Sequence, residues 1–356
     1  MDHLHLRHTA STGSAAQACL AHIARHPLDG TRASPLFTVT ETVRRLQQAA
    51  ATGDRLWVIN DRMDETAGAG PVSAWPLWFS EQSRNDERPL FYLTQSPTSA
   101  HLSMLTAQTA ERGIILNDIE SAPSRWAKGA HPWLPLWLAA NRQCTPFDPA
   151  CGEEASAILT GALQDLYVEG KPGFYYLTLH DEPGDGQPCD RSQASLGMYR
   201  LDAGPQDAQA PRVRLLGAGL MLREVRAAAV LLREQWGVCA EVWSCPSYTR
   251  LARDAERHAR RNRFGRGKVT ASCHLHACLA GAASPIVAAT GYAEFVAAQL
   301  AAYVTAPFTA LGCDSLEPGQ RLDRHWIVAT ALRGLAGQGV IGEQRVAEAL
   351  EVYRLG

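Results

Sequence analysis

Residues 213–224 read Val-Arg-Leu-Leu-Gly-Ala-Gly-Leu-Met-Leu-Arg-Glu, and this stretch decides how the second half of the chain is organised. It begins as an apolar strand, turns through Gly217-Ala218-Gly219 and continues with the apolar period of a helix. Because glycines let the backbone reverse tightly against a sheet, the stretch predicts a strand-turn-helix unit. A dinucleotide-binding loop is the alternative, but the third glycine is missing and no acidic residue follows a second strand at the required distance.

The alternation of strand and helix continues on both sides of this unit. Strand patterns occupy residues 55–60, 90–94, 113–117, 173–179, 212–216, 238–243, 285–290 and 307–312. Helical periods lie between them, and two further helices close the chain from about His325 and Glu343. This order predicts two α/β domains, the first with a mainly parallel sheet covered by helices on both sides and the second with a mixed sheet.

Composition places the domain boundaries. Residues 1–33 are expected to be an N-terminal extension, 34–180 the first domain, 181–211 a linker and 212–356 the second domain. The linker is inferred from its four prolines and four glycines, which disfavour regular structure. A length of 356 residues is sufficient for two domains that each bury a core.

Charge and cysteine usage exclude several classes of partner and location. The net charge is −2, which gives no reason to expect nucleic acid or an anionic membrane surface as a partner. The nine cysteines are scattered, without a CxxC pair or a preceding signal peptide, which is typical of a reducing cytoplasm. No apolar run approaches the roughly 18 residues of a membrane-spanning helix, so a cytoplasmic protein is expected.

Four segments in one order carry a family resemblance: residues 213–225, 251–257, 285–292 and 311–314. They resemble the C-terminal domain of the homodimeric pyruvate dehydrogenase decarboxylating component, a thiamine-diphosphate enzyme of the transketolase superfamily. Residues 112–116, 147–150 and 174–179 resemble, more weakly, the pyrimidine-binding domain of the same family. The resemblance covers about residues 35–356 and does not extend to the family's long N-terminal domain, which binds the diphosphate through a metal.

Thiamine catalysis needs a divalent metal on the diphosphate, a glutamate on the aminopyrimidine and a dry pocket. Gly184-Asp185-Gly186 matches the letters of the family's metal motif. It lies in the Pro-rich linker without a helix behind it, and no asparagine occurs between Asn141 and Asn262. We therefore expect no diphosphate site there.

The activating glutamate is the sharper test of the resemblance. The segment that would contain it is shortened and has only Glu65, Glu81 and Glu87, none followed by the small, apolar helix of the family. His131 is a weak catalytic candidate in the loop 118–132, with an ordinary loop histidine as the alternative. For the chain alone, the resemblance thus implies no bound cofactor and no metal, with thiamine diphosphate and magnesium expected only if a partner chain completes the site.

Three other clusters contain residues that could form binding sites. His3, His5 and His8 could hold a metal, but nothing nearby supplies a fourth ligand, so a frayed terminus is expected. The run Cys273-His274-Leu275-His276-Ala277-Cys278 contains four soft ligands, yet neither a strand nor a helix converges all four. The basic run 250–268 could bind an acidic partner, but its interspersed Asp254 and Glu256 favour a solvated helix face.

Two functions remain open from the sequence. One is a pyruvate dehydrogenase-like protein that serves as a non-catalytic binding or regulatory subunit. The other is half of a split thiamine-diphosphate-dependent 2-oxo-acid dehydrogenase, completed by another chain. Both predict a homodimer or a hetero-complex with a dehydrogenase or diphosphate-binding chain. The expected interface residues are aromatic: Trp75, Trp78, Phe79, Trp133 and Trp137.

Overall fold

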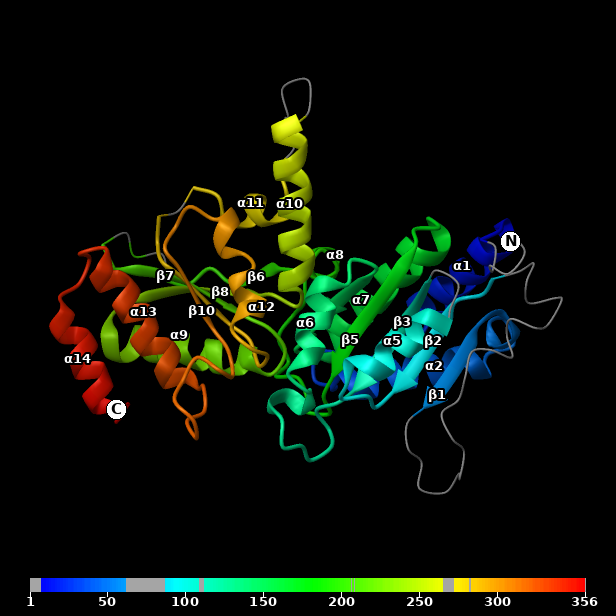
Figure 1. Cartoon of the computed structure of the whole chain (residues 1–356), viewed down its shortest axis with the longest axis horizontal. Coiled ribbons are helices and arrows are strands. Elements are labelled where there is room, and N and C mark those ends of the chain that lie inside the picture. Colours follow the sequence, from blue (N-terminus) through cyan, green and yellow to red (C-terminus); the bar gives the residue numbers. More distant parts are fainter. Residues whose placement is uncertain are drawn as a thin grey trace. The chain divides into compact units, whose positions relative to one another are not determined.

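The computed structural model describes residues 8–61, 87–108, 112–205, 207, 209–264, 272–281 and 283–355. The chain forms two compact units, unit 1 (Met1–Arg191) and unit 2 (Ser192–Gly356). Each unit is built on its own five-stranded sheet (Figure 1). The expected α/β class is therefore confirmed, with a parallel sheet in unit 1 and a mixed sheet in unit 2. Within the described residues, no helix is both long and apolar enough to cross a bilayer.

Unit 1 alternates strands with helices. Its strands are β1 (Trp57–Asp61), β2 (Leu90–Thr94), β3 (Arg112–Asp118), β4 (Cys144–Phe147) and β5 (Gly173–Leu179). Its α-helices are α1 (Ala10–Arg25), α2 (Pro35–Gln48), α5 (Ser99–Gln108), α6 (Trp133–Ala140) and α7 (Gly152–Leu163), with α8 (Arg191–Ala194) at the boundary. Short 3-10 turns are η2 (Gly53–Arg55) and η3 (Ala127–Gly129), and a π-helical turn, η4 (Gln164–Val168), extends α7.

The unit 1 sheet has the order β1-β2-β3-β5-β4, and all of its strands are parallel. Its register pairs Phe91 with Ile114 and Ile114 with Tyr175 across the three central strands. Every residue of these strands is buried, as expected for parallel strands covered on both faces. Strand β4 was not predicted, because Cys-Thr-Pro-Phe is short and contains a proline that is tolerated only at a sheet edge.

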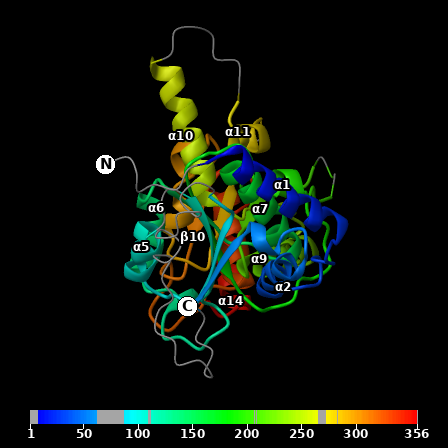
Figure 2. The same cartoon turned by 90° about the vertical axis from the view of Figure 1, so that its right-hand side faces the viewer.

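Helices cover both faces of this sheet. Alternate strand residues such as Phe91, Ile114 and Tyr175 pack with α1, α2 and α7 in one core cluster. Helices α5 and α6 contact each other on the other face (Figure 2). Helix α1 belongs to the core, since Ala16 and Cys19 are fully buried within it. The helix begins at a Thr9 capping box whose second member is Thr12, in place of the usual Glu.

Unit 2 begins with an edge strand and continues as a parallel βα alternation. Its strands are β6 (Tyr199–Asp202), β7 (Arg212–Gly217), β8 (Cys239–Ser244), β9 (Ile286–Ala289) and β10 (Phe308–Leu311). Its helices are α9 (Met221–Trp236), α10 (Tyr248–Phe264), α11 (His274–Leu279), α12 (Phe295–Ala298), α13 (Arg324–Gly337) and α14 (Glu343–Val352), with the 3-10 turn η5 (Ala301–Tyr303).

The unit 2 sheet has the order β10-β9-β7-β8-β6, with only β6 antiparallel. Strand β6 lies inside the segment expected to be a linker, and it pairs with β8 through a bulge between Arg200 and Asp202. Its four residues are too few to stand out among the surrounding prolines and glycines. The boundary between the two units, Arg191–Ser192, falls within the same segment.

The strand-turn-helix unit at residues 213–224 is confirmed. Strand β7 ends at Gly217, and α9 begins four residues later at Met221. Gly219 has a φ of +52°, and a Cβ on Gly217 would lie 2.8 Å from the Cα of Leu222. The glycines therefore let the helix approach the strand closely, which is the structural role the sequence favoured over a dinucleotide loop.

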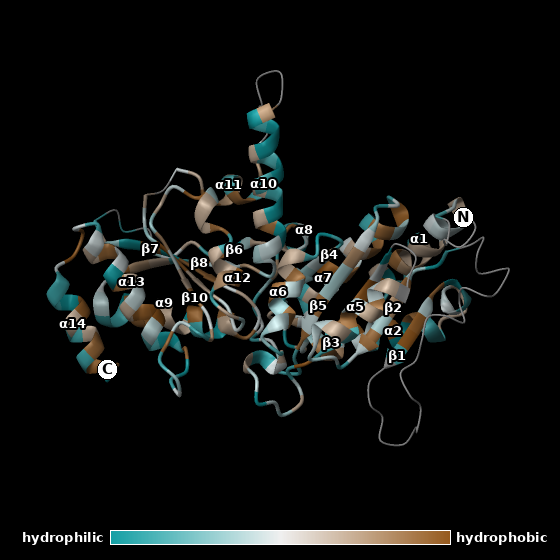
Figure 3. Ribbon diagram, viewed as in Figure 1, coloured by the Kyte–Doolittle hydropathy of each residue, from teal (hydrophilic) through white to brown (hydrophobic). Residues whose placement is uncertain are grey.

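Helix α10 contains most of the basic run. Figure 3 shows it as hydrophilic along most of its length, and its buried residues lie only in its first turns. Arg257 pairs with Asp254 at 3.3 Å, and Arg260 pairs with Glu256, each within the helix. These i,i+3 and i,i+4 pairs are typical of a solvated helix face.

Candidate functional site

Buried polar side chains gather where the strands of the unit 1 sheet end. In open α/β sheets, ligands bind outside the carboxyl ends of the strands. Here β2 and β3 end in polar residues, and β4 and β5 are each followed directly by an ionisable residue. The buried polar residues at this edge are Thr94, Ser96, Asn117, Asp118, Asp148, Thr178 and His180. This edge is the candidate functional site of unit 1.

Asn117 ties three parts of this edge together. Its Oδ1 accepts from the backbone N–H of Ser96 at 2.8 Å, and its Nδ2 donates to the Ser96 carbonyl at 2.8 Å and to the Tyr176 hydroxyl at 2.9 Å. The buried amide thus holds the end of β2 against β3 and β5. Because these bonds engage both its oxygen and its nitrogen, Asn117 serves the architecture of the edge.

A cluster of three charges lies beside this network. The Nζ of Lys128 is 2.7 Å from Oε2 of Glu120 and 2.9 Å from Oδ1 of Asp148. All three side chains are buried, with Lys128 only 2 % exposed. Glu120 follows β3 and Asp148 follows β4, so the lysine joins two loops at the carboxyl edge. We call these three residues the Lys128 triad.

The backbone that presents Lys128 is strained. Lys128 itself has a φ of +55°, which a residue with a Cβ adopts rarely. Gly129 follows with a φ of +68°, and a Cβ there would lie 1.8 Å from the carbonyl oxygen of Ile119. Only glycine fits at position 129, and the close approach fixes the turn that directs Lys128 inward.

Burial and charge act in opposite directions on the triad. Burial raises the pKa of Glu120 to about 7, against the attraction of Lys128, and it raises the pKa of Asp148 as well. The two carboxylates raise the pKa of Lys128 above its usual value despite the burial of its ammonium group. One ammonium therefore serves two buried carboxyls, and one of these can hold a proton near neutral pH.

The sequence did not identify this triad. Glu120, Lys128 and Asp148 are spread over a span that also contains α6 and β4, and they form no motif; only Asp148 lies in a segment that carried the family resemblance. The signal available in the sequence was the position of Glu120 two residues after the buried strand β3, where parallel strands end at one edge.

His131 lies near the start of α6. Its Nδ1 accepts from the backbone N–H of Trp133 at 3.2 Å, and its ring meets Trp126 edge-on with ring centroids 5.0 Å apart. Its own backbone N–H donates to the Pro97 carbonyl at 2.9 Å. These contacts are those of a residue that begins a helix and fixes a loop.

Glu87 occupies the opposite edge of the sheet. It precedes β2 and forms a buried ion pair with Arg112, the first residue of β3. The amino ends of parallel strands lie away from the carboxyl edge, so Glu87 is separated from the Lys128 triad by the length of the strands. Glu65 and Glu81, the other two glutamates of the shortened segment, lie outside the described residues.

The expected interface aromatics divide into two groups. Trp133 is 66 % exposed on α6, Leu136 is exposed beside it, and Trp137 is half-buried. Since positions i, i+3 and i+4 share a helix face, these three residues form one apolar surface, which we call the α6 surface. Trp75, Trp78 and Phe79 lie outside the described residues.

The histidines considered as metal ligands bond to separate backbone carbonyls. In α11, Nε2 of His274 bonds to the Met198 carbonyl and Nε2 of His276 to the Tyr303 carbonyl, both at 2.8 Å. His8 bonds through Nε2 to the Tyr167 carbonyl at 2.9 Å, while His3 and His5 lie outside the described residues. Over the described ranges, no group of three or more His, Cys, Asp or Glu side chains is arranged to hold a metal.

The Gly184-Asp185-Gly186 segment docks on a neighbouring loop. The N–H groups of Gly184 and Gly186 donate to the carbonyls of Arg32 and Thr31, each at 3.1 Å. A Cβ on Gly184 would lie 2.1 Å from the Thr31 carbonyl oxygen. Its glycines thus serve close backbone packing. Together with the position of Glu87, this means that the described residues do not fit the metal-bound thiamine diphosphate that the resemblance implies.

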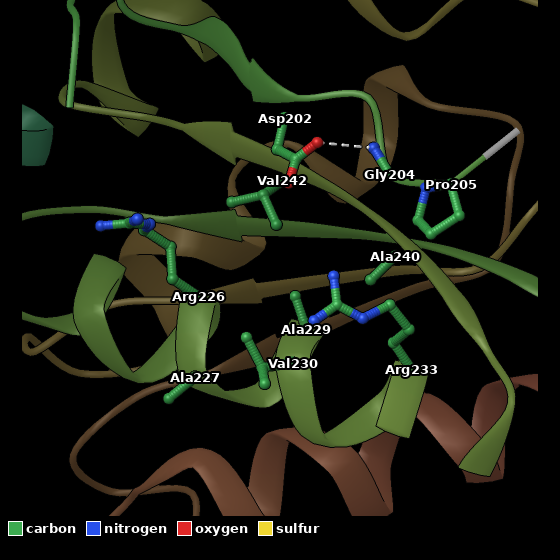
Figure 4. Close-up of a pocket in the computed structure, with 10 residues that line it drawn as sticks. All are labelled: Asp202, Gly204, Pro205, Arg226, Ala227, Ala229, Val230, Arg233, Ala240 and Val242. Carbon is green, nitrogen blue, oxygen red and sulfur yellow. Dashed lines mark hydrogen bonds between the residues drawn. The ribbon is translucent and has the colours of Figure 1, made fainter. Parts of the chain in front are cut away.

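Unit 2 contains a pocket of about 280 Å³ between α9 and the β8–β6 edge of its sheet (Figure 4). Arg226, Val230 and Arg233 line it from α9, and Ala240 and Val242 line it from β8. Across the pocket, a carboxylate oxygen of Asp202 accepts from the backbone N–H of Gly204 at 2.8 Å, so this acid shapes a turn. The wall formed by α9 therefore carries two cations, while the β8 residues of the lining are apolar.

The comparisons with known proteins agree with this architecture. Residues 197–316 match the family model described as the transketolase-like TK C-terminal domain. The pyruvate dehydrogenase E1 component of Cupriavidus necator is 34 % identical over 232 residues, which cover 62 % of this chain and 26 % of that protein. The E1 component of Pseudomonas aeruginosa is also 34 % identical, over 59 % of this chain and 25 % of that protein.

Among solved structures, transketolase from Leishmania mexicana superposes with a TM-score of 0.57 at 15 % identity, covering 96 % of this chain and 49 % of that one. At that identity the likeness concerns the fold alone. The chain spans about a quarter of the length of the curated relatives it matches. The chain therefore has a transketolase-like α/β fold, residues 197–316 are similar to the transketolase-like C-terminal domain, and the chain is similar to part of the pyruvate dehydrogenase E1 component.

Proposed function

We propose that this chain is a pyruvate dehydrogenase E1-like protein that acts as a non-catalytic binding or regulatory subunit. The observation that carries the proposal is the ion pair between Glu87 and Arg112. Glu87 is the described glutamate of the segment in which the resemblance would place the cofactor-activating one. It is buried, bound to a guanidinium and located at the amino edge of the sheet.

The carboxyl edge supports the same proposal. A thiamine enzyme needs a carboxyl group that can reach its cofactor, whereas Glu120 and Asp148 are both bound to Lys128 within the protein. At this edge, where open α/β sheets bind ligands, the Asn117 side chain bonds to Ser96 and Tyr176 and the Lys128 ammonium bonds to both carboxyls. Under this proposal, the chain alone has the fold of its relatives but does not catalyse a thiamine-dependent reaction.

Isothermal titration with thiamine diphosphate and Mg²⁺ tests this proposal. We expect no saturable heat and no decarboxylation of pyruvate by the purified chain, measured with an artificial electron acceptor. An intact pyruvate dehydrogenase E1 component, assayed in parallel, is the positive control. Stoichiometric cofactor binding, or turnover by the chain free of contaminating dehydrogenase, would contradict the proposal.

The second candidate is one half of a split thiamine-diphosphate enzyme completed by another chain. The observation that favours it is Glu120, whose pKa of about 7 places a titratable carboxyl at the carboxyl edge of the sheet. This candidate predicts that adding a diphosphate-binding chain restores cofactor binding and that Glu120→Gln abolishes the restored activity. If the chain has no catalytic role, Glu120→Gln should leave the activity of such a complex unchanged.

The proposal includes self-association or a complex with a dehydrogenase chain. The α6 surface supports this, since it exposes Trp133 and Leu136 side by side on one helix. A cytoplasmic location, and the absence of nucleic acid and membrane partners, remain predictions from composition.

A further inference from the structure

A second pocket, of about 490 Å³, lies among α1, α2 and α7 in unit 1. This volume falls within the range of small-molecule sites. The three helices contact one another on one face of the sheet (Figure 2). The pocket shares no residue with the Lys128 triad, the Glu87–Arg112 pair or the α6 surface. Its role is therefore independent of the proposed function.

The floor of this pocket is apolar. Leu20 and Ile23 of α1 line it, and both are partly buried against the core cluster of unit 1. Pro27 and Leu28 continue the apolar lining beyond the end of the helix. When an apolar group of a ligand contacts this floor, apolar surface of both the ligand and the protein is removed from water. The floor therefore favours a ligand with an apolar portion.

The rim of the pocket is cationic. Arg45 contributes from α2, Arg191 from the end of the unit, and His22 and His26 from the last turn of α1 and the residue after it. Glu153 of α7 is the acidic residue of the lining, and it lies 3.9 Å from Arg191. Basic groups thus outnumber acidic ones around the opening.

Several side chains at this rim have nitrogen atoms that are available for hydrogen bonds to a ligand. Arg45 uses Nε to bind Oε1 of Glu41 at 2.7 Å, and among the described residues its two Nη groups have no protein acceptor. The ring nitrogens of His22 and His26 likewise have no hydrogen-bond partner in the described part of the chain, although the two rings lie 4.6 Å apart. A carboxylate can accept from a guanidinium and an imidazole at the same time.

The charges around His22 also favour an anion. Burial lowers the pKa of His22, and the nearby positive groups of His26, Arg25 and Arg45 lower it further. Glu153 and Arg191 face the same space from α7 and the end of the unit, and their charges offset each other. An anion bound between Arg45 and the two histidines would reverse the repulsion and bring a proton onto His22.

We propose that this pocket binds a small carboxylate with a short apolar chain. Arg45 and the pair His22 and His26 hold the carboxylate, and Leu20 and Ile23 contact the chain. Neither part of the lining accounts for such a ligand alone, because a bare anion leaves the apolar floor in water and a neutral hydrocarbon leaves the donors unpaired.

Isothermal titration of the full chain with octanoate tests this inference. We expect saturable binding that is tighter at pH 6 than at pH 8, because binding favours protonated His22. Arg45→Gln should weaken it by roughly tenfold or more, since a charge-assisted hydrogen bond is lost. Arg44→Gln is the matched control: Arg44 also binds Glu41, at 2.7 Å, but does not line the pocket, and its variant should bind octanoate as the native chain does.

Two further ligands and one variant make the outcome decisive. Inorganic phosphate and 1-octanol should each bind much more weakly than octanoate. If phosphate bound as tightly as octanoate, the apolar floor would contribute nothing to affinity. If octanol bound as tightly as octanoate, the cationic rim would contribute nothing to affinity. Either result overturns the proposal. The double variant His22→Gln, His26→Gln should remove most of the pH dependence. Equal losses in the Arg44 and Arg45 variants would place binding elsewhere.

Discussion

The ammonium group of Lys128 lies 2.7 Å from the carboxylate of Glu120, and both side chains are almost completely removed from water. With Asp148 as its second partner, the lysine closes the edge of the sheet at which a ligand would be expected. These three buried charges are therefore paired with one another. We therefore expect the free energy of unfolding of unit 1 to depend strongly on single residues of the Lys128 triad.

Replacing Lys128 by methionine should strongly destabilise the chain. The substitution keeps an apolar stem of similar length but leaves Glu120 and Asp148 buried without a cation, which costs about 3–5 kcal/mol. Denaturation by urea measures the change. The control is Lys171→Met, because Lys171 also contacts two carboxylates, Asp165 and Glu169, but on the surface. The control should leave the free energy of unfolding nearly unchanged. Equal effects of the two substitutions would contradict the role of burial.

Glu120 should make stability depend on pH. Its pKa is raised from 4.5 to about 7 in the folded chain, so the folded state binds this proton more tightly than the unfolded state. Its contribution to stability is then present below about pH 4.5 and is lost as the pH rises through about 7. The loss is at most about 3 kcal/mol, from 1.36 kcal/mol per pKa unit.

Glu120→Gln provides the comparison for this pH dependence. The amide cannot ionise, so the decline in unfolding free energy between pH 4.5 and 7 should be shallower in the variant, as measured by urea denaturation across that range. Parallel curves for the native chain and the variant would mean that Glu120 does not titrate in this window.

Gly129→Ala should destabilise unit 1 more than the same change at a second left-handed glycine. Both Gly129 and Gly237 have positive φ values, +68° and +61°, so alanine costs roughly 1–2 kcal/mol of backbone strain at either site. At Gly237 nothing lies within 4 Å of the added methyl group, whereas at Gly129 the Ile119 carbonyl oxygen is 1.8 Å away. Thermal unfolding should show a clearly larger drop in Tm for Gly129→Ala. Equal drops would show that the loop relaxes without cost.

Trp133→Ala should weaken association while leaving the fold intact. Trp133 is 66 % exposed, so its removal changes little in the core but removes the largest part of the α6 surface. Sedimentation velocity at micromolar concentration should show a dimer or a hetero-complex for the native chain, with an interface on the scale of roughly 1,200–2,000 Å². Phe264→Ala, at a 78 % exposed position on α10, is the control and should not alter the mass. A native chain that sediments as a clean monomer would argue against the interface.

Limited proteolysis should cut first within residues 181–211. Pro/Gly-rich backbone between two compact units opens at little cost, whereas β6 within this segment is protected by pairing with β8. We therefore expect primary cleavage on either side of Tyr199–Asp202, read by mass spectrometry of the first fragments. Primary cleavage within 36–60 or 213–243 would contradict the proposed boundaries.

The sequence by itself determined the alternation of strands and helices. Apolar runs such as those of β5 and β7, and the turn at Gly217–Gly219, are local patterns whose period follows from backbone geometry. The order of four short segments was sufficient to identify the relatives. Two elements with weak local patterns were not predicted: β4 contains a proline, and β6 is short and antiparallel.

Only the tertiary structure decided what the ionisable residues do. The sequence argues against Glu87 as the activating glutamate only because no small, apolar helix follows it. Its ion-pair partner Arg112 is 25 positions away and lies beside it because β2 and β3 pair. Glu120, Lys128 and Asp148 meet because parallel strands end at one edge, and Arg45 meets His22 because α1 and α2 pack on the same face. Burial and pairing of charges depend on contacts between distant segments, which the local periodicity of a sequence does not encode.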